Sequence, residues 1–251
     1  MRVIDKIPEK AEIMTCKKHG DYEVKYLNAL KNKIWVNESC SECIKENYKK
    51  EEEEQKIKDI NANNTRKENL RLDAGISRRN LHKTFDDYIC TNEGQTKAKN
   101  DCMRYVENFP TDKSLIMVGG VGTGKTLLAS AIIDALVDNN KCEIVKVIDI
   151  VREFKSTWFK DSNKDELGII YHYQDLDLLI IDEVGSQFGS DTEKLFIFDV
   201  IDARYQDMKP TILISNLDID GIKDAIGERC VDRLREGGGS MIAFDWKSSR
   251  I

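Results

Sequence analysis

The feature that most constrains the fold is a glycine-rich segment, Gly119–Thr126, with the sequence GGVGTGKT. It follows an apolar stretch, Ser114–Val118, and opens a helix-periodic stretch, Lys125–Asp138. Glycines let the backbone turn tightly and point successive N–H groups at phosphate oxygens, and a helix N-terminus adds partial positive charge. A strand, such a loop and a helix in this order predict a parallel α/β fold with a phosphate site. The predicted phosphate-binding residues are Gly119, Gly120, Val121, Gly122, Thr123, Gly124, Lys125, Thr126 and Leu127.

The rest of the C-terminal two thirds alternates short apolar runs with amphipathic stretches. The strand-like runs are residues 143–150, 178–181, 211–215 and 240–244, and the helix-like stretches are 151–159 and 193–207. Strands that alternate with helices indicate βαβ units. We therefore predict a mostly parallel sheet flanked by helices.

Polar side chains end two of these strands. Asp182 and Glu183 follow the second run, and Asn216 follows the third. The carboxyl ends of parallel strands meet at one edge of a sheet, so Asp182 is expected near the loop, where it and Thr126 would hold Mg²⁺. Lys125 would reach the β- and γ-phosphates of ATP, or the β-phosphate of ADP. Glu183 would accept a proton from the attacking water. Asn216 would either orient that water or sense the γ-phosphate.

Several ordered segments together resemble a known family. Between residues 74 and 251 they read AGISRRNLHKTFDDY, GGVGTGKT, LLIIDEVG, RYQDMKPTILISNLD, IGERCVDRLRE and FDWKSSR. In these segments the chain is similar to AAA+ ATPases of the family that contains DnaC-type helicase loaders, IstB-type transposition helper ATPases and DnaC-like phage proteins. The resemblance implies a P-loop AAA+ core without a C-terminal helical lid. It also implies that the strand ending at Asn216 lies between the P-loop strand and the strand ending at Asp182.

The resemblance further implies roles for two arginines. Arg233, in ERCVDR, matches the arginine finger that acts on the nucleotide of a neighbouring subunit. Arg250, in FDWKSSR, resembles the sensor-2 arginine that faces the subunit's own nucleotide. Either guanidinium would neutralise charge that develops on the γ-phosphate. Arg204 and Arg235 remain alternatives for the residue that acts in trans.

A second candidate site lies near the N-terminus. Cys16 and His19 form one closely spaced pair, and Cys40 and Cys43 form another. Three thiolates and one imidazole suit tetrahedral Zn²⁺ with no open position, which predicts a structural site. About 45 residues bury too little apolar surface to fold unaided, so metal would supply folding energy. The alternative is incidental reduced thiols with a surface histidine. The lack of a secretory signal and the odd count of seven cysteines argue against a disulfide framework.

Composition divides the chain into three parts. We predict a zinc-binding module over residues 1–45, a charged helical linker over 46–75 and the ATPase domain over 76–251. Polar residues at Asn61–Asn64 predict that the helix ends there. No run approaches the ~18–20 apolar residues that cross a bilayer, and the charged N-terminus lacks the apolar core of a signal peptide. A soluble, cytoplasmic protein without a membrane partner is expected.

The net charge of −6 makes the whole chain a poor nucleic-acid binder, so any such contact must be local. Residues 151–164 offer the best candidate. Phe154 and Trp158 would stack on bases, while Lys155 and Lys160 would pair with phosphates. The alternative is an amphipathic helix with its aromatic residues in the core.

The resemblance implies an ATP-dependent helicase loader in DNA replication. It implies binding to a DnaB-type replicative helicase and to single-stranded DNA, self-association with ATP, and release on hydrolysis. The helicase contact would fall on the zinc module and linker. One alternative is an IstB-like transposition helper, against which the zinc ligands argue mildly. Another is an ATP-gated DNA-binding adaptor without significant turnover, against which Glu183 argues, since a pure switch needs no water-activating acid.

Overall fold

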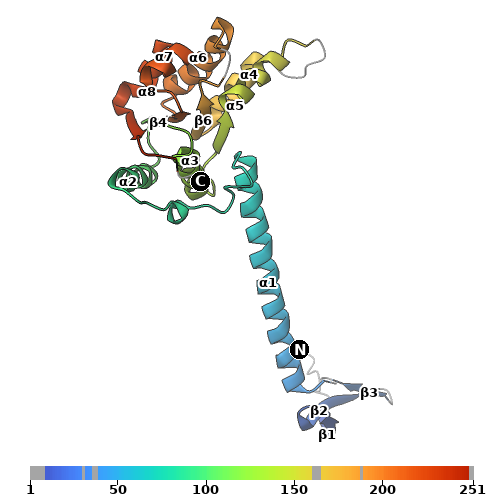
Figure 1. Ribbon diagram of the computed structural model, residues 1–251. Coiled ribbons are helices and arrows are strands. Elements are labelled where there is room, and N and C mark those ends of the chain that lie inside the picture. The colour runs from blue at the N-terminus through green and yellow to red at the C-terminus, as the bar shows by residue number, and fades with distance from the viewer. Residues whose placement is uncertain (1–8, 30–31, 36–38, 160–164, 187–188, 249–251) are drawn as a thin grey trace. The chain divides into compact units, whose positions relative to one another are not determined.

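The computed structural model describes residues 9–29, 32–35, 39–159, 165–186 and 189–248. The chain divides into two compact units, residues 1–65 and 66–251, and most of their helices and strands are labelled in Figure 1. Among the residues described, no helix combines the length and the apolar character needed to cross a membrane.

The first unit contains a three-stranded antiparallel sheet in the order β1-β2-β3. Its strands are β1 (Glu9–Cys16), β2 (Gly20–Ala29) and β3 (Asn32–Trp35). β1 and β2 pair along their length, up to Cys16 opposite Gly20. The tight turn between them carries His19, so the hairpin brings Cys16 and His19 to one end of the sheet.

Helix α1 (Ser41–Asp73) begins in the first unit and ends in the second. The predicted helix end at Asn61–Asn64 is wrong, because α1 continues through these residues and Thr65 Oγ1 donates to the Asn61 carbonyl oxygen at 3.0 Å. The segment contains no glycine or proline that would break a helix. None of its residues is buried, and polar pairs one turn apart, such as Gln55 and Asp59 at 2.7 Å, support it.

The described part of the second unit holds a five-stranded sheet with all neighbours parallel, in the order β5-β6-β7-β4-β8. The strands are β4 (Leu115–Gly119), β5 (Cys142–Lys146), β6 (Leu178–Val184), β7 (Thr211–Ser215) and β8 (Ser240–Phe244). The α-helices are α2 (Glu93–Glu107), α3 (Lys125–Leu136), α4 (Val147–Ser156), α5 (Glu166–Asp175), α6 (Asp191–Gln206), α7 (Ile219–Ile226) and α8 (Glu228–Arg235). Two short 3-10 helices are η1 (Phe85–Asp87) and η2 (Glu236–Gly238).

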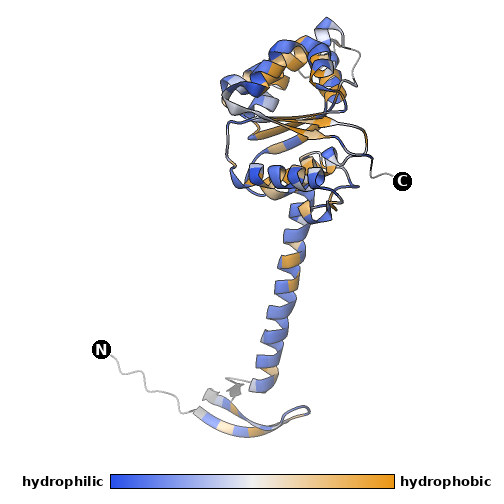
Figure 2. Ribbon diagram, turned by 60° about the vertical axis from the view of Figure 1, so that its left-hand side comes forward, coloured by the Kyte–Doolittle hydropathy of each residue, from blue (hydrophilic) through white to orange (hydrophobic). Residues whose placement is uncertain are grey.

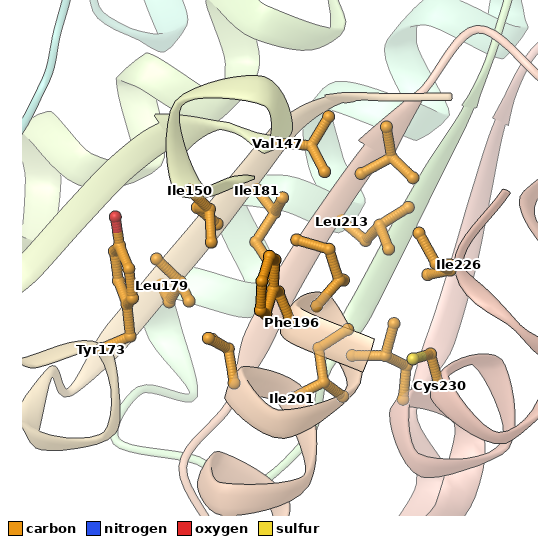
Figure 3. Close-up of a cluster of buried hydrophobic side chains, with 14 of the residues drawn as sticks. Val147, Ile150, Tyr173, Leu179, Ile181, Phe196, Ile201, Leu213, Ile226 and Cys230 are labelled. Atoms are coloured by element: carbon orange, nitrogen blue, oxygen red, sulfur yellow. The ribbon is translucent and has the colours of Figure 1, made fainter. Parts of the chain in front are cut away.

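Helices cover both faces of this sheet, which lies between two helical layers in Figure 2. The side chains of the central strands alternate between the layers, so that Leu115 and Met117 of β4 pack with α2 and α3. Ile116 and Val118 pack with α4 to α8 in the second cluster, part of which is drawn in Figure 3. Burial on both faces explains the continuous apolar runs seen in the sequence.

The predicted sheet order is confirmed, since β7 lies between β4 and β6. The bounds predicted for residues 211–215 and 240–244 also agree with β7 and β8. The strand predicted over residues 143–150 is too long, because β5 ends at Lys146 and α4 begins at Val147. The last four residues of that run, 147–150, form the start of α4 instead. The apolar face of this helix, which consists of residues 147, 150, 151 and 154, is buried.

Candidate functional site

The glycine-rich loop joins β4 to α3 at the carboxyl edge of the sheet. Gly119 and Gly124 have φ angles of 143° and 96°. A Cβ atom at Gly119 would lie 2.2 Å from the Phe244 carbonyl oxygen, and one at Gly124 would lie 2.4 Å from Cε2 of Tyr88. These two positions therefore accept only glycine. The two glycines let the loop backbone adopt these positive φ angles and pass close to Phe244 and Tyr88.

Lys125 is the first residue of α3 and is 5% exposed. Its Nζ donates to the carbonyl oxygens of Gly119 (2.6 Å) and Gly120 (2.7 Å). Burial lowers the pKa of Lys125, while the nearby Asp182 carboxylate acts in the opposite direction. The ammonium group is thus held against the loop, within reach of an anion bound there.

Thr126 and Asp182, the two predicted magnesium ligands, are in direct contact. Thr126 Oγ1 donates to Asp182 Oδ2 at 2.9 Å, and Asp182 lies on β6 with 6% exposure. Burial raises the pKa of Asp182, opposed by hydrogen bonds from the Glu183 backbone N–H and the Thr126 hydroxyl. A hydroxyl and a carboxylate placed side by side are oxygen ligands of the kind that Mg²⁺ takes next to a phosphate.

Glu183 sits in a special backbone conformation beside Asp182. Its φ angle is +57°, and its N–H donates to Asp182 Oδ1 at 2.7 Å. Its side chain is 44% exposed, and Glu183 Oε1 pairs with Lys146 Nζ at 3.1 Å. Positive φ at a residue other than glycine is strained, and such strain clusters at functional sites. Sequence reasoning gave Lys146 no role, although its place at the end of β5 brings it to the same sheet edge.

A cavity of about 590 Å³ brings these groups together. Asn216, which follows β7 and is exposed, lines the cavity together with the buried Asp182 and the half-buried Glu183. The other lining residues are Ser77, Arg79, Asn80, Asp87, Tyr88, Ile89, Val121, Gly122, Thr123, Gly124, Lys125, Thr126, Leu127, Lys146, Ile214 and Ser215. The lining residues between 77 and 88 lie in a segment that carried the family resemblance, and Ile89 directly follows it, but no role was predicted for any of them individually. The cavity thus combines groups that can donate hydrogen bonds to an anion, two carboxylic acids and a neutral amide.

Arg233 lies away from this cavity, on α8. Its Nε donates to Asp202 Oδ1 at 3.0 Å, and its guanidinium carbon lies 4.2 Å from the centre of the Tyr205 ring. Arg233 lines a different cavity with Ser114 and Thr211. Ser114 precedes β4 and Thr211 is the first residue of β7, so this cavity lies at the amino edge of the sheet. Arg233 is therefore at the opposite edge from the glycine-rich loop of its own chain.

Arg204 is excluded as an intersubunit residue. It is 0% exposed, and its guanidinium donates to Thr211 Oγ1 at 3.0 Å and to the Leu176 carbonyl oxygen at 2.9 Å. Further bonds to backbone carbonyls complete its partners. It therefore joins α6 to the neighbouring strand ends. Arg235 is exposed, and Arg250 lies outside the described residues.

The four predicted zinc ligands come together in the first unit, with their ligand atoms all within 4.8 Å of one another. His19 Nδ1 lies 3.3 Å from Cys43 Sγ and 3.7 Å from Cys40 Sγ, and the Cys16 and Cys43 sulfurs are 3.5 Å apart. Ligand atoms of a tetrahedron with bonds of ~2.0–2.3 Å lie roughly 3.5–3.8 Å apart. The cluster therefore has the spacing that lets it hold zinc.

Neighbouring groups tune this cluster. The backbone N–H groups of Lys18 and His19 lower the pKa of the Cys16 thiol to about 6, which favours the thiolate that binds metal. The hydrogen bond with Cys16 raises the pKa of Cys43 to about 11. On the other side of the imidazole, His19 Nε2 lies 3.2 Å from Glu46 Oε1. A carboxylate in that place fixes the tautomer and the orientation of a histidine ligand.

The candidate nucleic-acid contacts divide into two groups. Phe154 is 1% exposed and stacks on Phe196 at 4.5 Å, so its predicted role as a base-stacking residue is wrong and it belongs to the core. Trp158 is 59% and Phe159 74% exposed. Lys155 Nζ pairs with Glu193 Oε1 at 2.6 Å. Lys160 lies outside the described residues.

Together, the sheet order, the glycine-rich loop and the acids at the end of β6 define a P-loop nucleotide-binding domain of the AAA+ class. The family model described as IstB-like ATP binding protein matches residues 49–233. The chain belongs to this IstB-like ATP-binding family.

Two similar proteins are named replicative helicase loader DnaC. The one from Buchnera aphidicola subsp. Schizaphis graminum is 37% identical over 179 residues, which cover 70% of this chain and 73% of that protein. The one from Escherichia coli strain K12 is 36% identical over 176 residues, covering 68% and 71%.

Solved structures agree in fold. A crystal structure of the DnaC helicase loader has a TM-score of 0.58 at 24% identity and covers 66% of this chain and 99% of that one. The replication initiator DnaA, bound to AMPPCP and single-stranded DNA, has a TM-score of 0.56 at 23% identity and covers 65% and 50%. At these identities the likeness concerns the fold alone.

Proposed function

We propose that this protein is an ATP-hydrolysing loader of a replicative helicase. The observation that carries the proposal is identity of 36–37% to proteins named replicative helicase loaders, over more than two thirds of both chains. The ATPase domain over residues 76–251 would do the chemistry. The zinc module over residues 1–45 and the linker over 46–75 would contact a DnaB-type helicase.

The geometry of the cavity supports hydrolysis. Lys125 binds the β- and γ-phosphates of ATP, and Thr126 and Asp182 hold Mg²⁺, which neutralises charge on the phosphates. Glu183 accepts a proton from the attacking water, because its partly exposed carboxylate faces the same cavity. Asn216 orients that water or contacts the γ-phosphate.

A neighbouring subunit completes the site in this proposal. Arg233 lies at the opposite sheet edge from its own loop, so it can act only on the nucleotide of another copy. Self-association with ATP follows from this, and Arg250 would face the subunit's own nucleotide. Trp158 and Lys155 would bind single-stranded DNA, with Phe159 adding a second exposed ring. Hydrolysis would then release the DNA and the helicase.

A pull-down with the host's replicative helicase tests the partner. The full chain should retain the helicase, and ATP and ADP should give different yields. A chain that binds no helicase but binds a transposase would favour the transposition helper instead, in keeping with the name of the family model.

Glu183→Gln tests the reaction. Glutamine keeps the shape of the side chain but cannot take a proton, so ATP binding should persist while turnover falls by about 10²–10⁴-fold. Glu107→Gln, at an exposed position of α2 outside the cavity lining, is the matched control and should hydrolyse ATP normally. Unchanged hydrolysis in Glu183→Gln would remove Glu183 as the base. A wild-type chain that binds ATP without turnover would favour the adaptor.

A further inference from the structure

One carbonyl group in the glycine-rich loop accepts hydrogen bonds from two distant side chains. The Tyr88 hydroxyl and the Trp246 indole N–H each donate to the Thr123 carbonyl oxygen at 3.1 Å. Tyr88 follows η1, while Trp246 follows β8, so the donors come from opposite ends of the second unit's sequence. Thr123 is 1% exposed and Tyr88 7%, which keeps water from replacing the Tyr88 hydroxyl, while Trp246 is half-buried.

Both donors are held in place by rigid neighbours. The Tyr88 ring lies so close to Gly124 that a Cβ atom there would meet it at 2.4 Å. The Trp246 indole packs on Gly94 at the start of α2, where a Cβ atom would lie 3.3 Å from the ring. The indole also lies 5.0 Å from the Phe244 ring, centre to centre. Packing of this kind fixes the rotamers of side chains that position a site.

The direction of the Thr123 carbonyl decides the direction of the next N–H group. The peptide bond between Thr123 and Gly124 is trans, so the Gly124 N–H points opposite to the Thr123 carbonyl. With the carbonyl tied to Tyr88 and Trp246, the Gly124 N–H is fixed on the other side of the loop. A phosphate loop binds its ligand through N–H groups oriented in this way before the ligand arrives.

We propose that Tyr88 and Trp246 are positioning residues for nucleotide phosphates. They hold the Thr123–Gly124 peptide in the orientation that presents the Gly124 N–H to a phosphate oxygen. The inference rests on nucleotide binding by the loop. It does not depend on hydrolysis or on binding to a helicase. A negative result for Tyr88 and Trp246 would therefore leave the proposed loader function untouched, and the reverse also holds.

Tyr88→Phe and Trp246→Phe test the proposal, because each removes one donor and keeps an aromatic ring. Binding of a fluorescent ADP should weaken about fivefold in each single variant, the effect of one lost hydrogen bond. The double variant should weaken by more than the product of the two, since one remaining donor still restrains the carbonyl in each single variant and neither donor is left in the double variant. At saturating ATP, kcat should remain unchanged while KM rises, because no reacting group has been altered.

Tyr105→Phe is the matched control. It removes a buried hydroxyl that has no hydrogen-bond partner in the described part of the chain, so ADP affinity should stay at the wild-type value. Melting temperatures of all four variants separate positioning from general loss of stability. The proposal is overturned if the single and double variants bind ADP as the wild type does. It is also overturned if affinity falls only in step with the melting temperature, or if Tyr105→Phe weakens binding equally.

Discussion

The phosphate cavity and the cysteine–histidine cluster are built in opposite ways. The cavity is lined by the glycine-rich loop between β4 and α3 and by side chains at the strand ends, in a unit whose sheet has buried residues on both faces. The cluster is made by four side chains at a hairpin end and at the start of α1. In the part of the first unit whose exposure is described, the buried apolar residues are Val24, Tyr26 and Cys40.

This difference predicts different roles for the two ligands. A core that spans the whole second unit keeps the loop in shape by itself, so a nucleotide binds a site that is already formed. The small first unit buries little apolar surface, so zinc would be part of its folding energy. Removing one cavity residue should therefore cost binding alone, while removing one cluster residue should cost structure.

Cys40→Ser should have the largest effect. Serine is a poor ligand for zinc, and a structural zinc site contributes on the order of 10 kcal/mol to folding. We expect bound zinc to fall from about one equivalent per chain to none, and proteolysis to cut within residues 1–40. Metal analysis and limited proteolysis would measure this, and ATP binding should persist. Cys90→Ser, outside the cluster, is the control, and a metal-free wild-type chain with a protected N-terminus would contradict the zinc assignment.

Lys125→Ala tests the other half of the comparison. The loss of charged hydrogen bonds to the phosphates should weaken ATP binding by about 100-fold in a titration with labelled ATP. The melting temperature should change little, because burial already disfavours the Lys125 charge. Lys113→Ala, at an exposed position, is the control for the loss of a lysine. A parallel loss of fold in Lys125→Ala would mean that the cavity, like the cluster, depends on a single side chain.

The cavity was more predictable than its surroundings. The glycine-rich loop, Asp182 and Asn216 could be placed from sequence because each directly follows or belongs to a recognisable strand. Lys146 could not, since its pairing with Glu183 depends on β5 lying next to β6, which strand periodicity does not reveal. The zinc ligands could be chosen because their chemistry fixes their spacing.

Helical segments were harder to read. Phe154 and Trp158 lie four residues apart on one segment, yet one is in the core and the other is exposed, because the second follows the end of α4 at Ser156. Likewise, Arg204 and Arg233 both lie in segments that carry the family resemblance. The sequence does not distinguish their exposure, and only the packed structure reveals that Arg204 is buried. Sequence supplies the residue types, while tertiary neighbours decide which of them stay available.

Glu46→Gln should have the smallest effect and reaches the cluster without touching a ligand. Its carboxylate accepts from His19 Nε2 and pairs with Lys18, so it makes the imidazole a better ligand and fixes its orientation. An amide keeps an acceptor oxygen but loses the charge, so zinc affinity in a chelator competition should fall by about tenfold while one equivalent still binds. Glu42→Gln, one turn earlier on α1 and paired with Lys45 at 2.8 Å, is the matched control. Equal zinc affinities in the two variants would show that the four ligands alone set the strength of the site. The first unit would then depend on those four side chains and on none of their neighbours, in contrast to the cavity.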